Sequence, residues 1–136
     1  MRDLHNSIKV VHAITPQAVG TTGAANGQLS AVIDRQGYKS VEFAFSSGAS
    51  ATVADTITPI VYESDTATVG GFAAVADANL IGSEAPLALT AAKTGKVGYK
   101  GNKRYVGIRL YGIGTATAIV AATALLGHPN HAPAAT

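Results

Sequence analysis

Apolar and polar residues alternate in several short runs, and this alternation most limits what the chain can fold into. Residues 39–46 place Val41, Phe43 and Phe45 at every second position, and residues 103–113 repeat the pattern. Side chains of a β-strand point to its two faces in turn, so each run predicts a strand with one buried face. We therefore expect a chain built mainly of β-strands.

Turn-forming residues separate these runs and indicate the fold class. Gly, Asn and Ser cluster at their ends, as in Asn26-Gly27. Residues 115–126 are rich in alanine, which favours helix, but their alternation predicts another strand, and a single helical turn is expected at residues 77–81. Further strands are expected in residues 8–14, 28–34, 57–63, 69–75 and 96–100. Seven or eight short strands at this spacing predict an antiparallel β-sandwich or barrel.

Small residues dominate the composition and favour thin β-layers over a bundle of long helices. The 136 residues include 26 Ala, 15 Gly and 14 Thr, against 32 Val, Ile, Leu and Phe together. A chain of this length suits one domain. We expect a single sandwich domain over residues 1–127, including a short N-terminal arm, followed by an extended, Pro-punctuated tail over residues 128–136.

Several classes of protein are excluded or disfavoured by what the sequence lacks. The chain has no Cys, which excludes disulfide scaffolds, cysteine zinc sites and thiol catalysis. Residues 1–10 lack the continuous apolar segment of a signal peptide. The longest apolar stretch, near residues 119–126, is far shorter than the roughly 20 residues of a membrane span. We expect a soluble protein made in the cytoplasm, without membrane contact.

The charges are unevenly distributed along the chain. Residues 1–84 carry eight acids and four bases, whereas residues 85–136 carry six bases and no acid. All six bases lie within residues 93–109 and interleave with Tyr99 and Tyr105, which is typical of nucleic-acid binding. The formal net charge is only +2, so no direct contact with nucleic acid is expected. A basic turn around residues 95–104 equally suits docking on an acidic protein surface.

No candidate catalytic or metal site emerges from the ionisable residues. His128 and His131 are three positions apart, but no further ligand follows, so we expect a solvated tail without metal. His12 shares the alternation of the first run and is expected in the core or at an interface. Glu63 and Asp65 are expected in a solvated loop. With no nucleophile elbow, phosphate loop or dinucleotide fingerprint, we expect no enzyme activity and no cofactor.

Five stretches of sequence resemble a family of known proteins. They are MRDLHNSIKVVHAITP (residues 1–16), VIDRQGYKSVEF (32–43), VADANLIG (75–82), VGYKGNKRYV (97–106) and LLGHPNHAP (125–133). As a set they resemble small virion proteins that are encoded beside the major capsid gene of tailed bacteriophages. Within this group the chain is most similar to the cement, or decoration, proteins on the heads of short-tailed phages, and the likeness spans nearly the whole chain.

This resemblance implies a fold, a partner and a place of action. Such proteins are jelly-roll β-sandwiches that dimerise and clamp neighbouring subunits of the phage major capsid protein from outside, so the expected location is the outer surface of the virion. No catalytic residue is carried over. Exposure and charge select the expected capsid-contact residues, which are Arg2, Asp3 and His5 in the arm, Lys96, Lys100, Lys103 and Arg104 in the basic turn, and His128 and His131 in the tail.

Other readings of the sequence remain open. The basic turn is equally compatible with simple solvation. A head–tail junction or tail protein would share the small β-fold but form rings of few copies. A carbohydrate-binding module or a β-sandwich enzyme would instead show a groove with clustered aromatic and carboxylate side chains.

Overall fold

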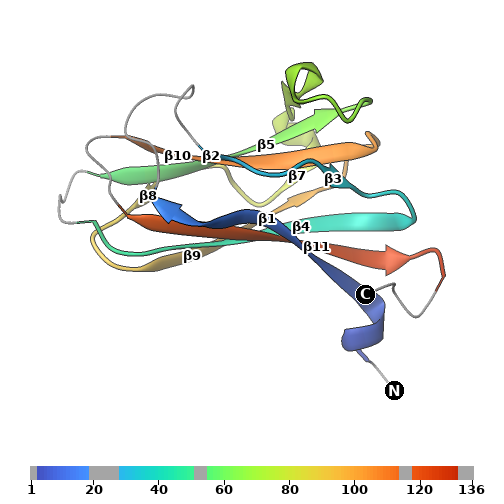
Figure 1. Ribbon diagram of the computed structural model, residues 1–136, viewed down its shortest axis with the longest axis horizontal. Helices are drawn as coiled ribbons and strands as arrows, with labels where there is room; N and C mark the ends of the chain where they lie inside the picture. The colour runs from blue at the N-terminus through green and yellow to red at the C-terminus, as the bar shows by residue number, and fades with distance from the viewer. Residues whose placement is uncertain (1–2, 19–27, 51–54, 114–117, 132–136) are drawn as a thin grey trace.

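Two antiparallel β-sheets pack face to face in the computed structural model, which describes residues 3–18, 28–50, 55–113 and 118–131 (Figure 1). Sheet A has the strand order β1-β11-β4-β9-β7. Its strands are β1 (Ile8–Ala18), β11 (Ile119–Pro129), β4 (Tyr38–Ser47), β9 (Lys93–Tyr99) and β7 (Leu80–Ile81). In the described ranges, the 3-10 helical turns η1 (His5–Ser7), η3 (Val69–Gly71) and η4 (Asp77–Asn79) connect or precede the strands.

Sheet B has the order β2-β10-β5-β6, with β3 paired to β10 and β8 paired to β5. Its strands are β2 (Gln28–Leu29), β10 (Tyr105–Ile113), β5 (Thr56–Ser64), β6 (Ala73–Ala74), β3 (Ile33–Asp34) and β8 (Leu87–Ala88). In Figure 1, β10 and β5 form the upper layer, and β1, β11, β4 and β9 form the lower one.

The order of the strands is that of a jelly roll. When β2 with β3, and β6 with β8, are each counted as one interrupted strand and the two-residue β7 is left out of the count, sheet A contains the first, eighth, third and sixth strands and sheet B the second, seventh, fourth and fifth. Successive long connections therefore cross between the sheets, and the first and last strands lie side by side. The expected all-β sandwich of jelly-roll type is confirmed.

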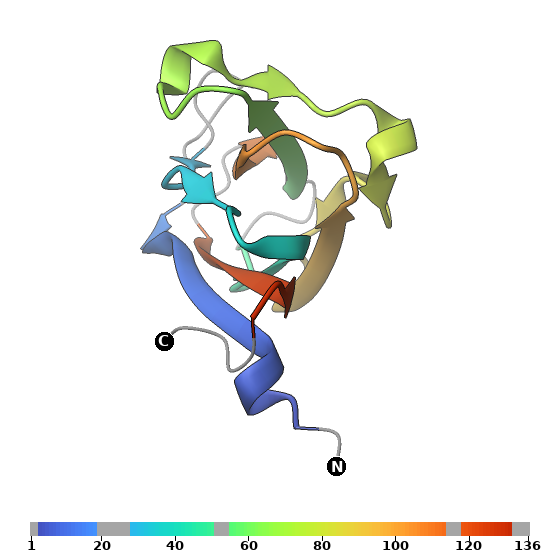
Figure 2. The same ribbon diagram turned by 90° about the vertical axis from the view of Figure 1, so that its right-hand side faces the viewer.

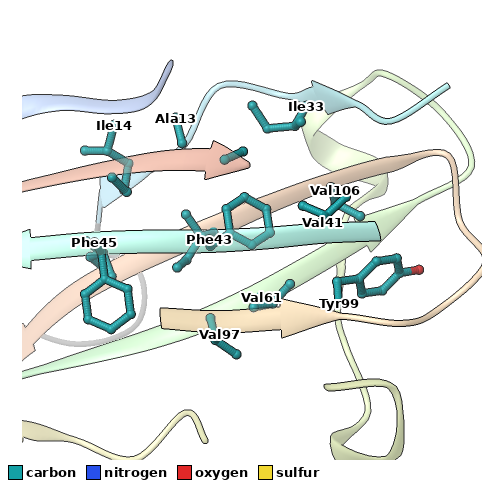
Figure 3. Close-up of a cluster of buried hydrophobic side chains, with 14 of the residues drawn as sticks. Ala13, Ile14, Ile33, Val41, Phe43, Phe45, Val61, Val97, Tyr99 and Val106 are labelled. Carbon is teal, nitrogen blue, oxygen red and sulfur yellow. The ribbon is translucent and has the colours of Figure 1, made fainter. Parts of the chain in front are cut away.

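Alternating side chains from both sheets form the core. Val41 and Phe43 of β4 face Val61 and Val106 of sheet B, and all four are at most 2% exposed (Figure 3). Burial of each such side chain stabilises the fold by about 1.5–3 kcal/mol. The inward residues of β11 combine large and small side chains, with Val120 and Leu126 at its ends and Ala122 and Ala124 between them.

The predicted strands are confirmed where the alternation is regular. They are wrong where glycines or hydrogen bonds to two different sheets interrupt the strand. Residues 39–46 and 103–113 correspond to β4 and β10, and the strand predicted over 115–126 is found as β11 from Ile119 onward, with residues 115–117 outside the described ranges. Residues 69–75 instead form η3 and the short β6, because the Gly70-Gly71 pair offers no side chain to a strand. The predicted strand 28–34 is interrupted, since Ser30 N–H bonds to sheet B (Ile108 O, 2.8 Å) whereas Ala31 N–H bonds to β1 (Ala13 O, 3.0 Å).

A change of register in β1 decides where His12 lies. The pairing with β11 shifts between His12 and Ile14, so that Ala13 and Ile14 are both buried. His12 is left on the same face as Val10, and both are exposed. Of the two predicted places for His12, the core is therefore excluded, because a bulge breaks the two-residue period, and the interface stays a prediction.

Both predicted terminal segments are more ordered than expected at their inner ends. In the arm, His5–Ser7 form η1 instead of extended chain, and η1 projects from the sandwich beside the end of β11 (Figure 2). The strand β11 continues to Pro129, which pairs with Tyr38, so the first two residues of the predicted tail belong to a strand. A hydrogen bond from Asn130 N–H to Gly37 O, 2.8 Å long, holds this end in place.

Candidate docking surface

The outer face of sheet A is formed by the side chains that alternate with the core residues. Strand pairing aligns them in cross-strand rows, such as Val10–Leu125–Glu42–Gly98–Ile81. The face comprises Val10, His12, Ser40, Glu42, Ala44, Ser46, Ile81, Thr94, Lys96, Gly98, Ile119, Ala121, Thr123 and Leu125. Most of these side chains are small or apolar, so the surface is smooth.

Three large apolar side chains are exposed on this one face. Val10, Ile81 and Ile119 are 60%, 57% and 54% exposed, and they lie on β1, β7 and β11. Single exposed apolar residues are normal on a soluble protein, and these three lie at the margins of one face, at its two edge strands and at the start of β11, which makes this face the candidate contact surface.

Small side chains leave a shallow hollow at the centre of the face. Ala44, Ser46, Thr94, Ala121 and Thr123 line it, and its volume is about 290 Å³. The hollow has room for an apolar side chain, and the hydroxyls of Ser46 and Thr94 beside it are hydrogen-bonding groups.

Ionisable groups are sparse on this face. Glu42 lies on β4 and Lys96 on the neighbouring β9, with Lys96 beside Ala44. A Cβ atom at Gly98 would lie 2.7 Å from Glu42 Oε2, so the Glu42 side chain extends across this glycine. Depletion of charge at the centre is a property of protein–protein contact surfaces.

Two of the four residues expected in the basic turn form ion pairs within the chain. Lys103 Nζ forms an ion pair with Asp65 Oδ2, and Arg104 binds Asp34 through two bonds of 3.0 and 2.7 Å. The hydrogen bond with Arg104 lowers the pKa of Asp34, and the hydrogen bond with Asp65 raises the pKa of Lys103. The sequence alone does not show these ion pairs, because the acids are distant from Lys103 and Arg104 along the chain. β10 pairs with both β3 and β5, and this pairing brings Asp34 and Asp65 beside the two bases.

Lys96 and Lys100 remain exposed cations. Lys96 belongs to the outer face of sheet A, whereas Lys100 lies in the turn after β9, where its N–H donates to Asn79 O at 2.9 Å. Within the described ranges neither forms an ion pair. Of the four lysines and arginines predicted for contact, only Lys96 therefore lies on the candidate surface.

The predicted contacts at the chain ends are placed as follows. Asp3 accepts hydrogen bonds from His5 N–H (2.9 Å) and from the Asn6 side chain, so its carboxylate organises η1. His128 has a left-handed backbone (φ 54°), and its Nδ1 lies 2.8 Å from Ser40 Oγ at the border of the candidate surface. His5 and His131 are exposed, and Arg2 lies outside the described residues.

A polar network stiffens the end of the sandwich next to this turn. The Tyr99 hydroxyl donates to Glu63 Oε2 and accepts the Lys103 N–H at 3.0 Å, while the Arg35 guanidinium lies 5.2 Å from the centre of the Tyr99 ring. Burial and the Glu63 carboxylate raise the pKa of Tyr99 to about 12. The prediction of Glu63 in a solvated loop is wrong, because Glu63 is the half-buried inward residue near the end of β5.

The described ranges contain no group of three or more His, Asp or Glu side chains that would hold a metal ion. Asp77 and Glu84 line one polar pocket, but Glu84 Oε1 accepts the Val61 N–H at 2.7 Å and so covers the edge of β5. Burial raises the pKa of Glu84. No helix in the described part of the chain is long and apolar enough to span a membrane.

No protein-family model and no curated protein matches the sequence. Among solved structures, the PBSX exported protein XepA is similar over the whole chain, with 15% identity and a TM-score of 0.58, and the chain spans 42% of the length of XepA. A structure of infectious bursal disease virus (15% identity, TM-score 0.48) covers 93% of the chain, which spans 33% of that protein. The CBM22-1 xylan-binding domain of Paenibacillus barcinonensis Xyn10C (9% identity, TM-score 0.42) covers 96% of the chain, which spans 88% of it.

At these identities, the likeness to XepA shows the β-sandwich fold alone. Any indication of what this chain does must therefore come from the residues of its own surface. The half-buried strand predicted over residues 39–46 agrees with Ser40, Glu42 and Ala44 on the outer face, but the sequence did not indicate the exposed Val10, Ile81 and Ile119. That these three apolar side chains lie exposed on one face becomes evident only when the pairing of the five strands of sheet A is known.

Proposed function

We propose that the chain is a structural virion protein that binds the outside of a phage head and stabilises contacts between major capsid subunits. The outer face of sheet A is the observation that carries this proposal, because it is smooth, poor in charge and exposes Val10, Ile81 and Ile119. Such a face acts by adhesion and needs no reacting group. In this proposal the protein is a homodimer whose partner is the phage major capsid protein.

The mechanism is the burial of apolar surface at the seams between subunits. Each docked copy removes apolar area from water at about 25 cal/mol per Å², less the cost of lost motion on binding. A copy that touches two neighbouring subunits adds its binding free energy to their contact. Repetition over a symmetric shell turns modest single contacts into a large stabilisation of the whole particle.

A binding experiment tests the proposal. Purified protein is mixed with expanded phage heads that lack it, and cosedimentation gives affinity and copy number. Ala44→Arg, at the centre of the outer face of sheet A, is expected to weaken binding at least about tenfold, since it buries an unpaired charge. The matched control is Ala73→Arg on the exposed β6 of sheet B, which is expected to bind like the unmodified chain.

The same experiment separates the alternative functions. Saturation at hundreds of copies supports a cement protein, whereas about a dozen or fewer would indicate a ring at a head–tail junction. Absence of saturable binding at any concentration would contradict both. Binding of the isolated chain to a glycan, unaffected by Ala44→Arg, would favour a carbohydrate-binding module instead.

A further inference from the structure

β1 is the edge strand of sheet A and has a free side. Within the described residues it pairs with β11 alone, and on its other side one backbone hydrogen bond is formed, from Ala31 N–H to Ala13 O. Residues 8–12 therefore present alternate N–H and C=O groups without a neighbouring strand. Such an edge is a template for pairing with another chain.

The side chains of residues 8–12 restrict the register in which this edge can pair with the same edge of a second copy. Val10 and His12 belong to the outer face of sheet A, whereas Lys9 and Val11 point to the core side, where both line a hollow of about 430 Å³. Directly opposite residues of an antiparallel pair share one face of the sheet. A two-fold axis must therefore pass through a residue and not between two residues.

Only one of the remaining registers uses the whole free edge. With the axis at Lys9, the two ammonium groups would lie directly opposite each other, which destabilises the pair. With the axis at Val11 or His12, the partner strand would need Ala13, whose carbonyl is already bonded to Ala31. With the axis at Ile8, it would need the residues of η1.

The axis at Val10 avoids all three obstacles. It pairs Ile8 with His12 and Lys9 with Val11, and it places the two Lys9 side chains on the diagonal, about 7–8 Å apart between backbones. Val10, which is 60% exposed in the single chain, then meets its own copy on the axis.

We propose that two copies join edge to edge through Ile8–His12 of β1, antiparallel, with Val10 on the two-fold axis. This inference rests on the proposed homodimer and names its interface. The five strands of each sheet A continue into those of the other copy, giving one sheet of ten strands. The outer faces of the two copies then form one continuous docking surface with two-fold symmetry.

Engineered cysteines test the register, because the natural chain contains none. Opposite residues of an antiparallel pair have Cα atoms about 4.5–5.5 Å apart, within the range that a disulfide spans. Under mild oxidation Val10→Cys is expected to form a covalent dimer. His12→Cys alone is expected to stay uncrosslinked, but to form mixed dimers with Ile8→Cys. Equal crosslinking of Val10→Cys and His12→Cys would overturn the proposed register.

The mass in solution provides a second test. Light scattering is expected to give twice 13.7 kDa for the unmodified chain and 13.7 kDa for Val10→Lys, which places two cations on the axis. The matched control is Ile81→Lys, at the opposite edge of the same face, which is expected to remain dimeric while its binding to phage heads falls. A monomeric unmodified chain would refute this inference. A dimer that does not bind heads would instead refute the proposed function.

Discussion

A close contact between the neighbouring strands β4 and β9 of sheet A restricts position 95 to glycine. Gly95 of β9 pairs with Phe45 of β4, and a Cβ atom at this position would overlap the Phe45 ring. The ring therefore occupies the space that any other residue would need. This is how a core of small residues still accommodates one of its three Phe side chains.

Gly95→Ala is expected to destabilise the fold by about 1–3 kcal/mol, because the Phe45 ring must leave its rotamer or the strands must separate. Urea unfolding measures the change. Gly70→Ala is the control, since a Cβ atom there meets nothing within 4 Å, and it is expected to change stability by less than about 0.5 kcal/mol. Equal effects of the two substitutions would contradict the packing of Phe45 against Gly95.

The Asp34–Arg104 pair makes stability depend on acid pH. The pKa of Asp34 is lower in the folded chain than in the unfolded one, so its ionised form stabilises the fold above the unfolded pKa of about 3.9. That contribution is lost as pH falls through the folded value. Asp34→Asn should therefore reduce stability at pH 7 by about 1 kcal/mol or less, given the exposure of the pair, and should have a smaller effect near about pH 2. Urea unfolding at both pH values tests this, and an equal loss at both would contradict the ion pair.

At the scale of elements, the network around Tyr99 joins β9, β5 and the turn before β10. Its hydroxyl bonds to Glu63 and to the Lys103 N–H, so removal of one oxygen atom leaves two groups without their partner. Such losses cost about 1–3 kcal/mol when the groups are shielded from water. The network fixes the end of the sandwich that carries the basic turn.

Tyr99→Phe is expected to lower the free energy of unfolding by about 1–3 kcal/mol at pH 7. Because the folded pKa of Tyr99 is raised to about 12, this stabilisation is complete below the unfolded pKa of about 10 and disappears as pH rises through the folded value. Tyrosinate absorbance should lose its component near pH 12 in the variant. Tyr62→Phe, which keeps the ring that lies 5.3 Å from Arg109, is the control and should retain that component.

Strands could be predicted from the sequence wherever local alternation and burial agree, as at Val41, Phe43 and Phe45. The bulge at Ala13 could not, because it depends on the hydrogen bond from Ala31 in the segment between the two sheets. The pairing of Lys103 with Asp65 could not be predicted either, since 38 positions separate the two residues. Local sequence patterns therefore predict single strands. They do not predict the candidate surface, because that surface depends on the order in which distant strands pair.

At the scale of the whole molecule, internal pairing of Lys103 and Arg104 changes what should drive binding. The exposed outer face of sheet A carries few charges, so apolar burial and not counter-charge should dominate the affinity. Apolar contacts are little screened by salt, whereas exposed charges are.

Affinity for phage heads is therefore expected to change less than about threefold between roughly 0.05 and 0.5 M NaCl. Cosedimentation at both salt concentrations measures it. The double variant Lys103→Ala, Arg104→Ala should bind like the unmodified chain. A loss of affinity above about tenfold at high salt, or in the double variant, would instead show that the basic turn is the contact.

The adjacency of β1 and β11 has a consequence for synthesis on the ribosome. Ile8 pairs with Gly127, so sheet A cannot close until residue 127 has been translated. At 5–20 residues per second, about 6–22 s pass between completion of β1 and completion of β11. During that interval β1 lacks its partner strand β11, so both of its sides are free to pair. Neighbouring ribosomes on one message would bring several such unpaired strands close together.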